Sequence, residues 1–169
     1  STVYSSQMDT DKKIILEPIT IYSRGERAIG GITPLMISTN CDYVEVYFKD
    51  IMIAKEYPAT NKYPGLKHPP IIINIEQNIP GVSSMNWEDL KVIGYINGKA
   101  EIERKYLKNP TFKELEITAD DKEINSINEG TAWDSTRITI KAVDSCGNRL
   151  PYINEAINIE VKGAGELIG

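Results

Sequence analysis

Acidic side chains are the first residues in this sequence whose spacing could support catalysis. The chain carries 24 Asp and Glu residues, among them the alternating pairs Glu101/Glu103 and Glu114/Glu116. Two carboxyl groups can act together in catalysis, one as an acid and one as a nucleophile, only when they lie close to each other in a pocket. Residues at i and i+2 of a strand share one face, and Asp and Glu are rarely buried. We therefore interpret these pairs as solvated strand faces and assign no catalytic residue.

Histidine and cysteine supply little further chemistry. His68 is the one histidine and lies between Lys67 and Pro69, where a structural role is favoured because a general base needs an orienting partner. Cys41 and Cys146 are 105 positions apart (146 − 41) and are interpreted as two free thiols. Two cysteines and one histidine do not make a Cys/His zinc site. We expect no metal and no cofactor.

Aromatic residues are the stronger binding candidates. Trp87, Trp133, Tyr57 and Tyr63 lie in or beside predicted loops. Exposed rings of this kind could stack on sugars and form a carbohydrate-binding surface. The alternative, which we favour, is that they cover the ends of the fold or pack against other domains through their large apolar area.

Composition narrows the partner classes. The chain has 169 residues, 41% of them hydrophobic and 25% charged, with a net charge of −5. A negative net charge disfavours nucleic acid and anionic lipid as partners, since binding to either requires a basic protein surface. No apolar run approaches the ~20 residues that span a bilayer, and the polar start of the chain lacks the apolar region of a signal peptide. The compartment, cytoplasmic or exported, is left open.

Alternation of apolar and polar residues predicts an all-β fold. Val44, Val46 and Phe48 alternate with Glu45 and Tyr47, as expected of a half-buried strand. Turns are predicted at 49–50 and 97–98, and four prolines make 57–71 an extended surface loop. Strands are expected at 14–16 and 19–21 (one edge strand interrupted at Pro18), 34–39, 43–49, 51–54, 71–75, 88–96, 100–106, 112–119, 122–125, 138–142 and 157–161.

The order of these strands suggests two immunoglobulin-like β-sandwich domains. We expect a flexible segment at 1–13, a first sandwich at 14–109 and a second, incomplete sandwich at 110–169, with the boundary near Asn109–Pro110. A sandwich of this class has about seven strands in about 100 residues, more than the last part of the chain can supply. The second sandwich should then leave a strand edge open, which could pair with another copy as an edge-strand homodimer.

Several motifs in combination resemble a known family. Residues 38–49 (STNCDYVEVYFK), 63–72 (YPGLKHPPII) and 89–99 (DLKVIGYINGK) resemble the first module after the barrel in glycoside hydrolase family 2 enzymes of the β-galactosidase type. Residues 138–151 (ITIKAVDSCGNRLP) and 157–169 (INIEVKGAGELIG) resemble the next module. One departure is Lys-Asp at the first hairpin tip, where the family usually has Asn-Gly.

This resemblance implies a C-terminal accessory region of a bacterial enzyme in carbohydrate metabolism. The catalytic glutamates of the family lie on a TIM barrel upstream, so none is carried over to this chain, which we expect to be inactive by itself. Its partners would be the catalytic and other domains of the same parent chain, which it would brace or extend. The alternative is a carbohydrate-binding or adhesion-type immunoglobulin-like module of a bacterial surface protein. Sugar specificity and oligomeric state stay open.

Overall fold

The computed structural model of the chain describes residues 2–22, 32–80, 88–124, 134–163 and 165–168. Strands dominate this part of the chain, and the only helices in it are the single turns α1 (Thr2–Ser5) and α2 (Ile75–Asn78). The predicted all-β fold is therefore confirmed. The strands are β1 (Leu16–Ile19), β2 (Leu35–Thr39), β3 (Tyr43–Phe48), β4 (Ile51–Glu56), β5 (Ile71–Ile73), β6 (Leu90–Ile96), β7 (Lys99–Tyr106), β8 (Glu114–Ala119) and β9 (Ile138–Val143).

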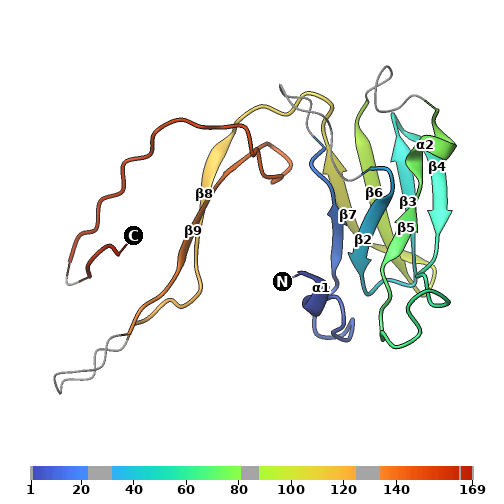
Figure 1. The fold of residues 1–169 in the computed structure, drawn as a ribbon, viewed down its shortest axis with the longest axis horizontal. Coiled ribbons are helices and arrows are strands. Elements are labelled where there is room, and N and C mark those ends of the chain that lie inside the picture. Colours follow the sequence, from blue (N-terminus) through green and yellow to red (C-terminus); the bar gives the residue numbers. More distant parts are fainter. Residues whose placement is uncertain (1, 23–31, 81–87, 125–133, 164, 169) are drawn as a thin grey trace.

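Strands β1 to β7 form two facing antiparallel sheets (Figure 1). One sheet has the order β1-β2-β5 and the other the order β4-β3-β6-β7. Side chains of both sheets share one buried cluster, which includes Leu35 and Ile37 of β2, Val44 and Val46 of β3, and Val92 of β6. Such strands in two packed sheets make an immunoglobulin-like β-sandwich.

Strand β3 shows how the sequence produces this sandwich. Val44 and Val46 are 0% exposed and Phe48 is 8% exposed, while Glu45 and Tyr47 between them are half-buried on the outer face. The alternation follows from the two-residue period of a strand, and it confirms the predicted register. Because each buried aliphatic side chain contributes about 1.5–3 kcal/mol, this strand is a main source of stability.

The two hairpin tips lie where turn chemistry predicts them. Asn97 and Gly98 have φ of 52° and 76°, the positive values that a two-residue turn requires. Lys49 and Asp50 adopt φ of 49° and 61°, although neither is glycine. The less typical Lys-Asp pair thus forms the same kind of turn, with the small backbone strain that a left-handed non-glycine residue carries.

Two predicted strands of the sandwich need comment. Pro18 lies within β1, and β1 is an edge strand, where the missing N–H of proline costs no ladder hydrogen bond. The strand predicted at 71–75 ends at Ile73, and α2 begins at Ile75, which is 1% exposed. Ile75 still enters the core, so the apolar pattern is satisfied by a helical turn instead of a longer strand.

The N-terminal residues have definite contacts with the sandwich. The Gln7 side chain donates to the His68 carbonyl (2.7 Å) and accepts from the His68 N–H (3.0 Å). Asn40 is 2% exposed and bridges the same segment, donating to the carbonyls of Met8 (3.1 Å) and Lys13 (2.8 Å). Its Oδ1 accepts from the Ile15 N–H at 2.8 Å. How mobile this segment is in solution is measurable by amide hydrogen exchange.

We expect Asn40→Ala to destabilise the sandwich by about 2 kcal/mol. The change removes three hydrogen bonds from a buried side chain and leaves backbone groups unpaired. Urea unfolding measures the loss. Asn61→Ala is the matched control for asparagine loss at an exposed side chain, and an equal loss in both variants would contradict the bridging role of Asn40.

Residues after 110 form a smaller structure to one side of the sandwich (Figure 1). Strands β8 and β9 pair antiparallel as a two-stranded ribbon with two different faces. Leu115, Ile117 and Ile140 lie on one face, and Ile117 is 65% exposed. Glu116 and Lys141 lie on the other face and form an ion pair at 3.4 Å. The ribbon therefore shows the pattern of a core face that is left largely uncovered.

Two strands predicted in this part are wrong. Residues 122–124 form no strand, and Asn125 lies outside the described residues. Residues 157–161 alternate as a strand should, but they have no paired neighbour in the described part of the chain. Alternation alone does not make a strand, because the backbone N–H and C=O groups need a partner strand for their hydrogen bonds.

A turn at the end of β9 joins the ribbon to the sandwich. Asp144 is 2% exposed, and its Oδ1 accepts from the N–H groups of Cys146 and Asn148, both at 2.9 Å. The Asn148 side chain donates to the carbonyl of Lys105 on β7 at 2.7 Å. Gly147 supplies the positive φ, 78°, that this turn needs. The turn thus ties the ribbon to the neighbouring edge strand.

Tyr106 lies beside this turn, and its ionisation makes the free energy of unfolding depend on pH in the alkaline range. Burial raises the pKa of Tyr106 to about 12, the carboxylates of Glu17 and Asp144 add to the rise, and Arg104 opposes it. An unfolded tyrosine ionises near pH 10. The contribution of Tyr106 is therefore complete below about pH 10 and is lost as the pH rises toward 12.

We expect Tyr106→Phe to reduce the loss of stability between about pH 10 and 12, because the variant has no hydroxyl to ionise there. Urea unfolding at a series of alkaline pH values measures it. Tyr57→Phe, at a side chain that is 58% exposed, is the matched control. An unchanged pH slope in Tyr106→Phe would contradict this assignment.

Candidate functional site

The carboxylates that the sequence offered for catalysis lie on exposed faces. Glu101, Glu103, Glu114 and Glu116 are all exposed side chains on β7 and β8. Glu101 pairs with Lys99 at 3.1 Å, and Glu116 pairs across the ribbon with Lys141. Such exposed ion pairs contribute little energy and leave the carboxylates in water. The geometry gives these residues no catalytic pocket.

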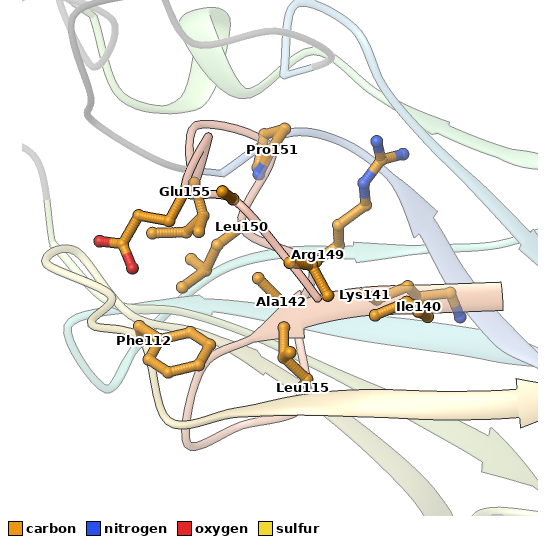
Figure 2. A pocket seen from close by; sticks show the side chains of 12 residues that line it. Phe112, Leu115, Ile140, Lys141, Ala142, Arg149, Leu150, Pro151 and Glu155 are labelled. Carbon is orange, nitrogen blue, oxygen red and sulfur yellow. The ribbon is translucent and has the colours of Figure 1, made fainter. Parts of the chain in front are cut away.

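Two of the cavities among the described residues have volumes of about 270 Å³ each. Figure 2 shows the first, between the apolar side of the ribbon, with Phe112 and Leu115, and the returning chain, with Leu150 and Pro151. Glu155 is its single carboxylate. The second cavity is lined by Glu17 and Glu103, and Arg104 binds the Glu17 carboxylate. Neither cavity holds two available carboxyl groups for an acid and a nucleophile.

Histidine and cysteine are placed as structural residues. The backbone of His68 is held on both sides by Gln7, and its buried Nε2 has no hydrogen-bond partner among the described residues. Cys41 and Cys146 are free thiols, as predicted, and burial raises the pKa of Cys41. No group of three or more potential ligands that could hold a metal occurs among the residues that the structure describes. In the same residues, no helix is long and apolar enough to cross a bilayer.

Of the four aromatic candidates, only two can be placed. Trp87 and Trp133 lie outside the described residues. Tyr63 is half-buried in the proline-rich loop, and the Lys62 ammonium lies 5.6 Å from its ring centroid. Tyr57 is 58% exposed and lies directly after β4. Tyr57, unlike Tyr63, has other tyrosines as neighbours.

These neighbours form a tyrosine face on the outer side of the four-stranded sheet, which we define as Tyr43, Tyr47, Tyr57 and Tyr95 around Glu45. Tyr43 and Tyr95 are directly opposite each other on β3 and β6, and their rings stack at 4.7 Å with an interplanar angle of 8°. Tyr57 packs against Tyr43 at 5.4 Å and 41°. The outer face thus carries three rings in contact, with Tyr57 the most exposed of them.

Glu45 holds the tyrosine face together electrostatically. The hydroxyls of Tyr47 and Tyr95 both donate to its Oε2, at 2.7 and 2.8 Å. These bonds lower the pKa of Glu45, chiefly through Tyr47, and the carboxylate in turn raises the pKa of Tyr95 to about 12. The Lys55 ammonium lies 4.3 Å from the Tyr43 ring centroid. At neutral pH the face therefore presents an anion, a cation and hydroxyl groups that stay protonated.

The sequence alone predicted only some members of this cluster. It placed Glu45 and Tyr47 on the outer face, but it could not place Tyr95 opposite Tyr43, because the register between β3 and β6 is set by contacts distant in sequence. The available signal was the alternation Tyr43, Glu45, Tyr47 opposite the buried valines. The second signal was Tyr95 itself, which lies two residues before the predicted turn at 97–98.

Comparison with known proteins finds relatives that match the whole length of this chain. No family model matches it. The chain is 43% identical over 173 aligned residues to a beta-galactosidase of Thermoanaerobacterium thermosulfurigenes, covering 100% of this chain and 24% of that protein. It is 34% identical to a beta-galactosidase of Rhizobium meliloti, covering 99% of this chain and 22% of that protein. The chain thus spans about a quarter of the length of these relatives.

A solved structure agrees in fold. A beta-glycosidase from Bacteroides vulgatus superposes with a TM-score of 0.54 at 18% identity, over 89% of this chain and 16% of that protein. A glycosyl hydrolase family 2 member from Bacteroides cellulosilyticus matches 69% of this chain at 22% identity, with a TM-score of 0.40. The full-length sequence match confirms the resemblance to β-galactosidases indicated by the motifs: over its whole length the chain is similar to about a quarter of proteins named beta-galactosidase, and its described residues include a β-sandwich.

Proposed function

We propose that this chain is a non-catalytic region that braces or extends the catalytic part of a β-galactosidase-type enzyme in carbohydrate degradation. The observation that carries the proposal is the match of the entire chain to a quarter of a beta-galactosidase. Neither of the two cavities described above contains a pair of available carboxylates, and this favours a non-catalytic role. The partners are then the catalytic and other domains of the same parent chain.

A segment exchange tests this role. In the beta-galactosidase of Thermoanaerobacterium thermosulfurigenes, the matching segment is deleted, or replaced by this 43% identical chain. A bracing role predicts that deletion lowers the melting temperature and the activity, and that the exchange restores both with KM unchanged. KM for a small aryl β-galactoside stays constant because the segment supplies no residue to the site of bond cleavage. Full activity and stability after deletion would contradict the bracing role.

We further propose that the chain consists of two units, 14–109 and 110–169, with 1–13 as an appended segment. Within the part of the chain that the structure describes, the core cluster draws only on residues before Pro110, and no sheet includes strands from both sides of that position, which supports this division. A two-stranded ribbon is marginal alone. Residues 1–109 expressed alone should therefore unfold cooperatively with native stability, and residues 110–169 alone should not. Loss of cooperative unfolding in 1–109 would contradict the division.

The exposed apolar side of the ribbon supports one further partner, a second copy of this chain paired edge to edge. Ile117 and Ile138 of the ribbon, and Ile157 of the chain that follows it, are each at least half exposed, and unpaired strand edges associate readily. We expect sedimentation velocity to show association that increases with concentration. Ile117→Lys should weaken that association, with Ile51→Lys on the sandwich as the control. A concentration-independent monomer would contradict the homodimer.

The alternative function, a carbohydrate-binding or adhesion-type immunoglobulin-like module, has one observation in its favour. Tyr57 exposes its ring and packs against Tyr43, whose ring lies 4.3 Å from the Lys55 ammonium. Titration of the chain with glycans at millimolar concentration tests this alternative, and the absence of saturable binding would contradict it.

A further inference from the structure

The tyrosine face combines three groups that recognise the same class of ligand. Tyr57 offers an aromatic ring that is 58% exposed at the end of β4. Glu45 offers a carboxylate whose Oε2 already accepts two tyrosine hydroxyls, while its Oε1 accepts no hydrogen bond from the described residues. Lys55, the cross-strand partner of Glu45, offers an ammonium that lies 4.3 Å from the centroid of the Tyr43 ring.

The packing of the rings shows which of them is available. Tyr43 has Tyr95 stacked at 4.7 Å, Tyr57 at 5.4 Å and the Lys55 ammonium 4.3 Å from its centroid. Its ring is thereby surrounded and acts as a support. The Tyr47 ring has the Lys91 ammonium 4.9 Å from its centroid. Tyr57 is the ring whose surface a ligand can reach. Its contact with Tyr43 already restricts the Tyr57 side chain, so less conformational entropy is lost when a ligand binds.

The charges exclude the simpler ligand classes. A cationic ligand would compete with Lys55 and Lys91, which already lie over the tyrosine rings. An anionic ligand would meet the Glu45 carboxylate, and a wholly apolar ligand would desolvate Glu45 and Lys55 without replacing their hydrogen bonds. A neutral polyol with one C–H-lined face satisfies all three groups, because the ring face packs on an aromatic side chain while hydroxyls bond the carboxylate and the ammonium.

We propose that the tyrosine face binds a pyranose unit of a neutral oligosaccharide, with Tyr57 as the stacking ring and Glu45 and Lys55 as hydrogen-bond partners. The choice of a saccharide rests on the proposed function, since the relatives are named for hydrolysis of galactosides. Because the stacking ring of Tyr57 is 58% exposed, binding should be weak, with a Kd on the order of 1 mM. It would hold substrate chains near the enzyme and take no part in bond cleavage.

Nuclear magnetic resonance titration of the whole chain tests this site. The probes are β-1,4-galactotetraose and, in a separate arm, cellotetraose, which is also neutral and has the same number of pyranose units. We expect saturable shifts confined to Tyr57, Tyr43, Glu45 and Lys55 with at least one probe. No saturable shift with either probe would overturn the proposal.

Variants make the assignment specific. Tyr57→Ala should weaken binding at least about tenfold, whereas Tyr57→Phe should bind within about twofold of the original, because stacking needs the ring and not the hydroxyl. Glu45→Gln should weaken binding about fivefold, because a neutral amide accepts hydrogen bonds less strongly than a carboxylate. Tyr63→Ala is the matched control and should bind normally. Binding that survives Tyr57→Ala, or is lost in Tyr63→Ala, would overturn the site.

A protein occupant is the competing outcome. If these resonances shift on adding the separately expressed remainder of the parent enzyme but not with either tetrasaccharide, the tyrosine face is a domain interface and the saccharide proposal is overturned. This result differs from failure of the proposed function, which the segment exchange measures: the exchange can restore activity whether or not the tyrosine face binds sugar.

Discussion

Replacing Val46 with aspartate is expected to unfold the β-sandwich. Val46 is 0% exposed at the middle of β3, between the two sheets, and pairs with Val92 of β6 and Ala54 of β4. An unpaired carboxylate there loses its water without gaining a partner, at a cost of about 4 kcal/mol or more. That loss approaches the whole stability of a domain this size, about 5–15 kcal/mol.

Circular dichroism melting measures the effect of Val46→Asp. The matched control is Ile51→Asp, which makes the same chemical change at a side chain that is 67% exposed on the neighbouring strand. The control should melt within a few degrees of the original chain. Equal melting temperatures for Val46→Asp and the original would show that Val46 does not face the core.

Gly94→Val is expected to cost at least about 3 kcal/mol. A Cβ atom at Gly94 would lie 2.6 Å from Cys41 Sγ and 2.9 Å from Ile102 Cγ2. Cys41 is 2% exposed, so its side chain has little room to move away. Gly94 also precedes the register shift between β6 and β7, where the bend brings the strands close. Overpacking of this kind forces side chains and backbone to shift.

Urea unfolding of Gly94→Val and of the double variant Gly94→Val/Cys41→Ala separates the causes. Removing Sγ should recover part of the lost stability, because the closest clash is with that atom. Gly65→Val is the control, since nothing lies within 4 Å of a Cβ placed there. No recovery in the double variant would contradict Cys41 as the main obstacle.

Local patterns were sufficient for most of the fold. The valines of β3 and the turn at Asn97–Gly98 depend on neighbouring residues, so period and turn chemistry predicted them. The edge position of Pro18 followed from its missing N–H. Ile157 to Val161 was wrongly predicted as a strand, because alternation cannot tell whether a neighbouring strand exists.

The candidate site was less predictable for the same reason. Tyr57 was singled out as an exposed aromatic residue, but its importance depends on Tyr43, Tyr95 and Glu45, which sheet pairing brings together. The stacking of Tyr43 on Tyr95 requires the register of β3 with β6, and no local spacing contains that information. Motif resemblance located the chain in its family without identifying any of these contacts.

The central claim, that this chain supports a galactoside-cleaving enzyme without cleaving substrate itself, is tested most directly by assaying the purified chain with an aryl β-galactoside. The expected result is no turnover above the buffer rate, with the beta-galactosidase of Thermoanaerobacterium thermosulfurigenes active in the same assay. Turnover that survives repurification and is lost on changing one acidic residue of this chain would contradict the account.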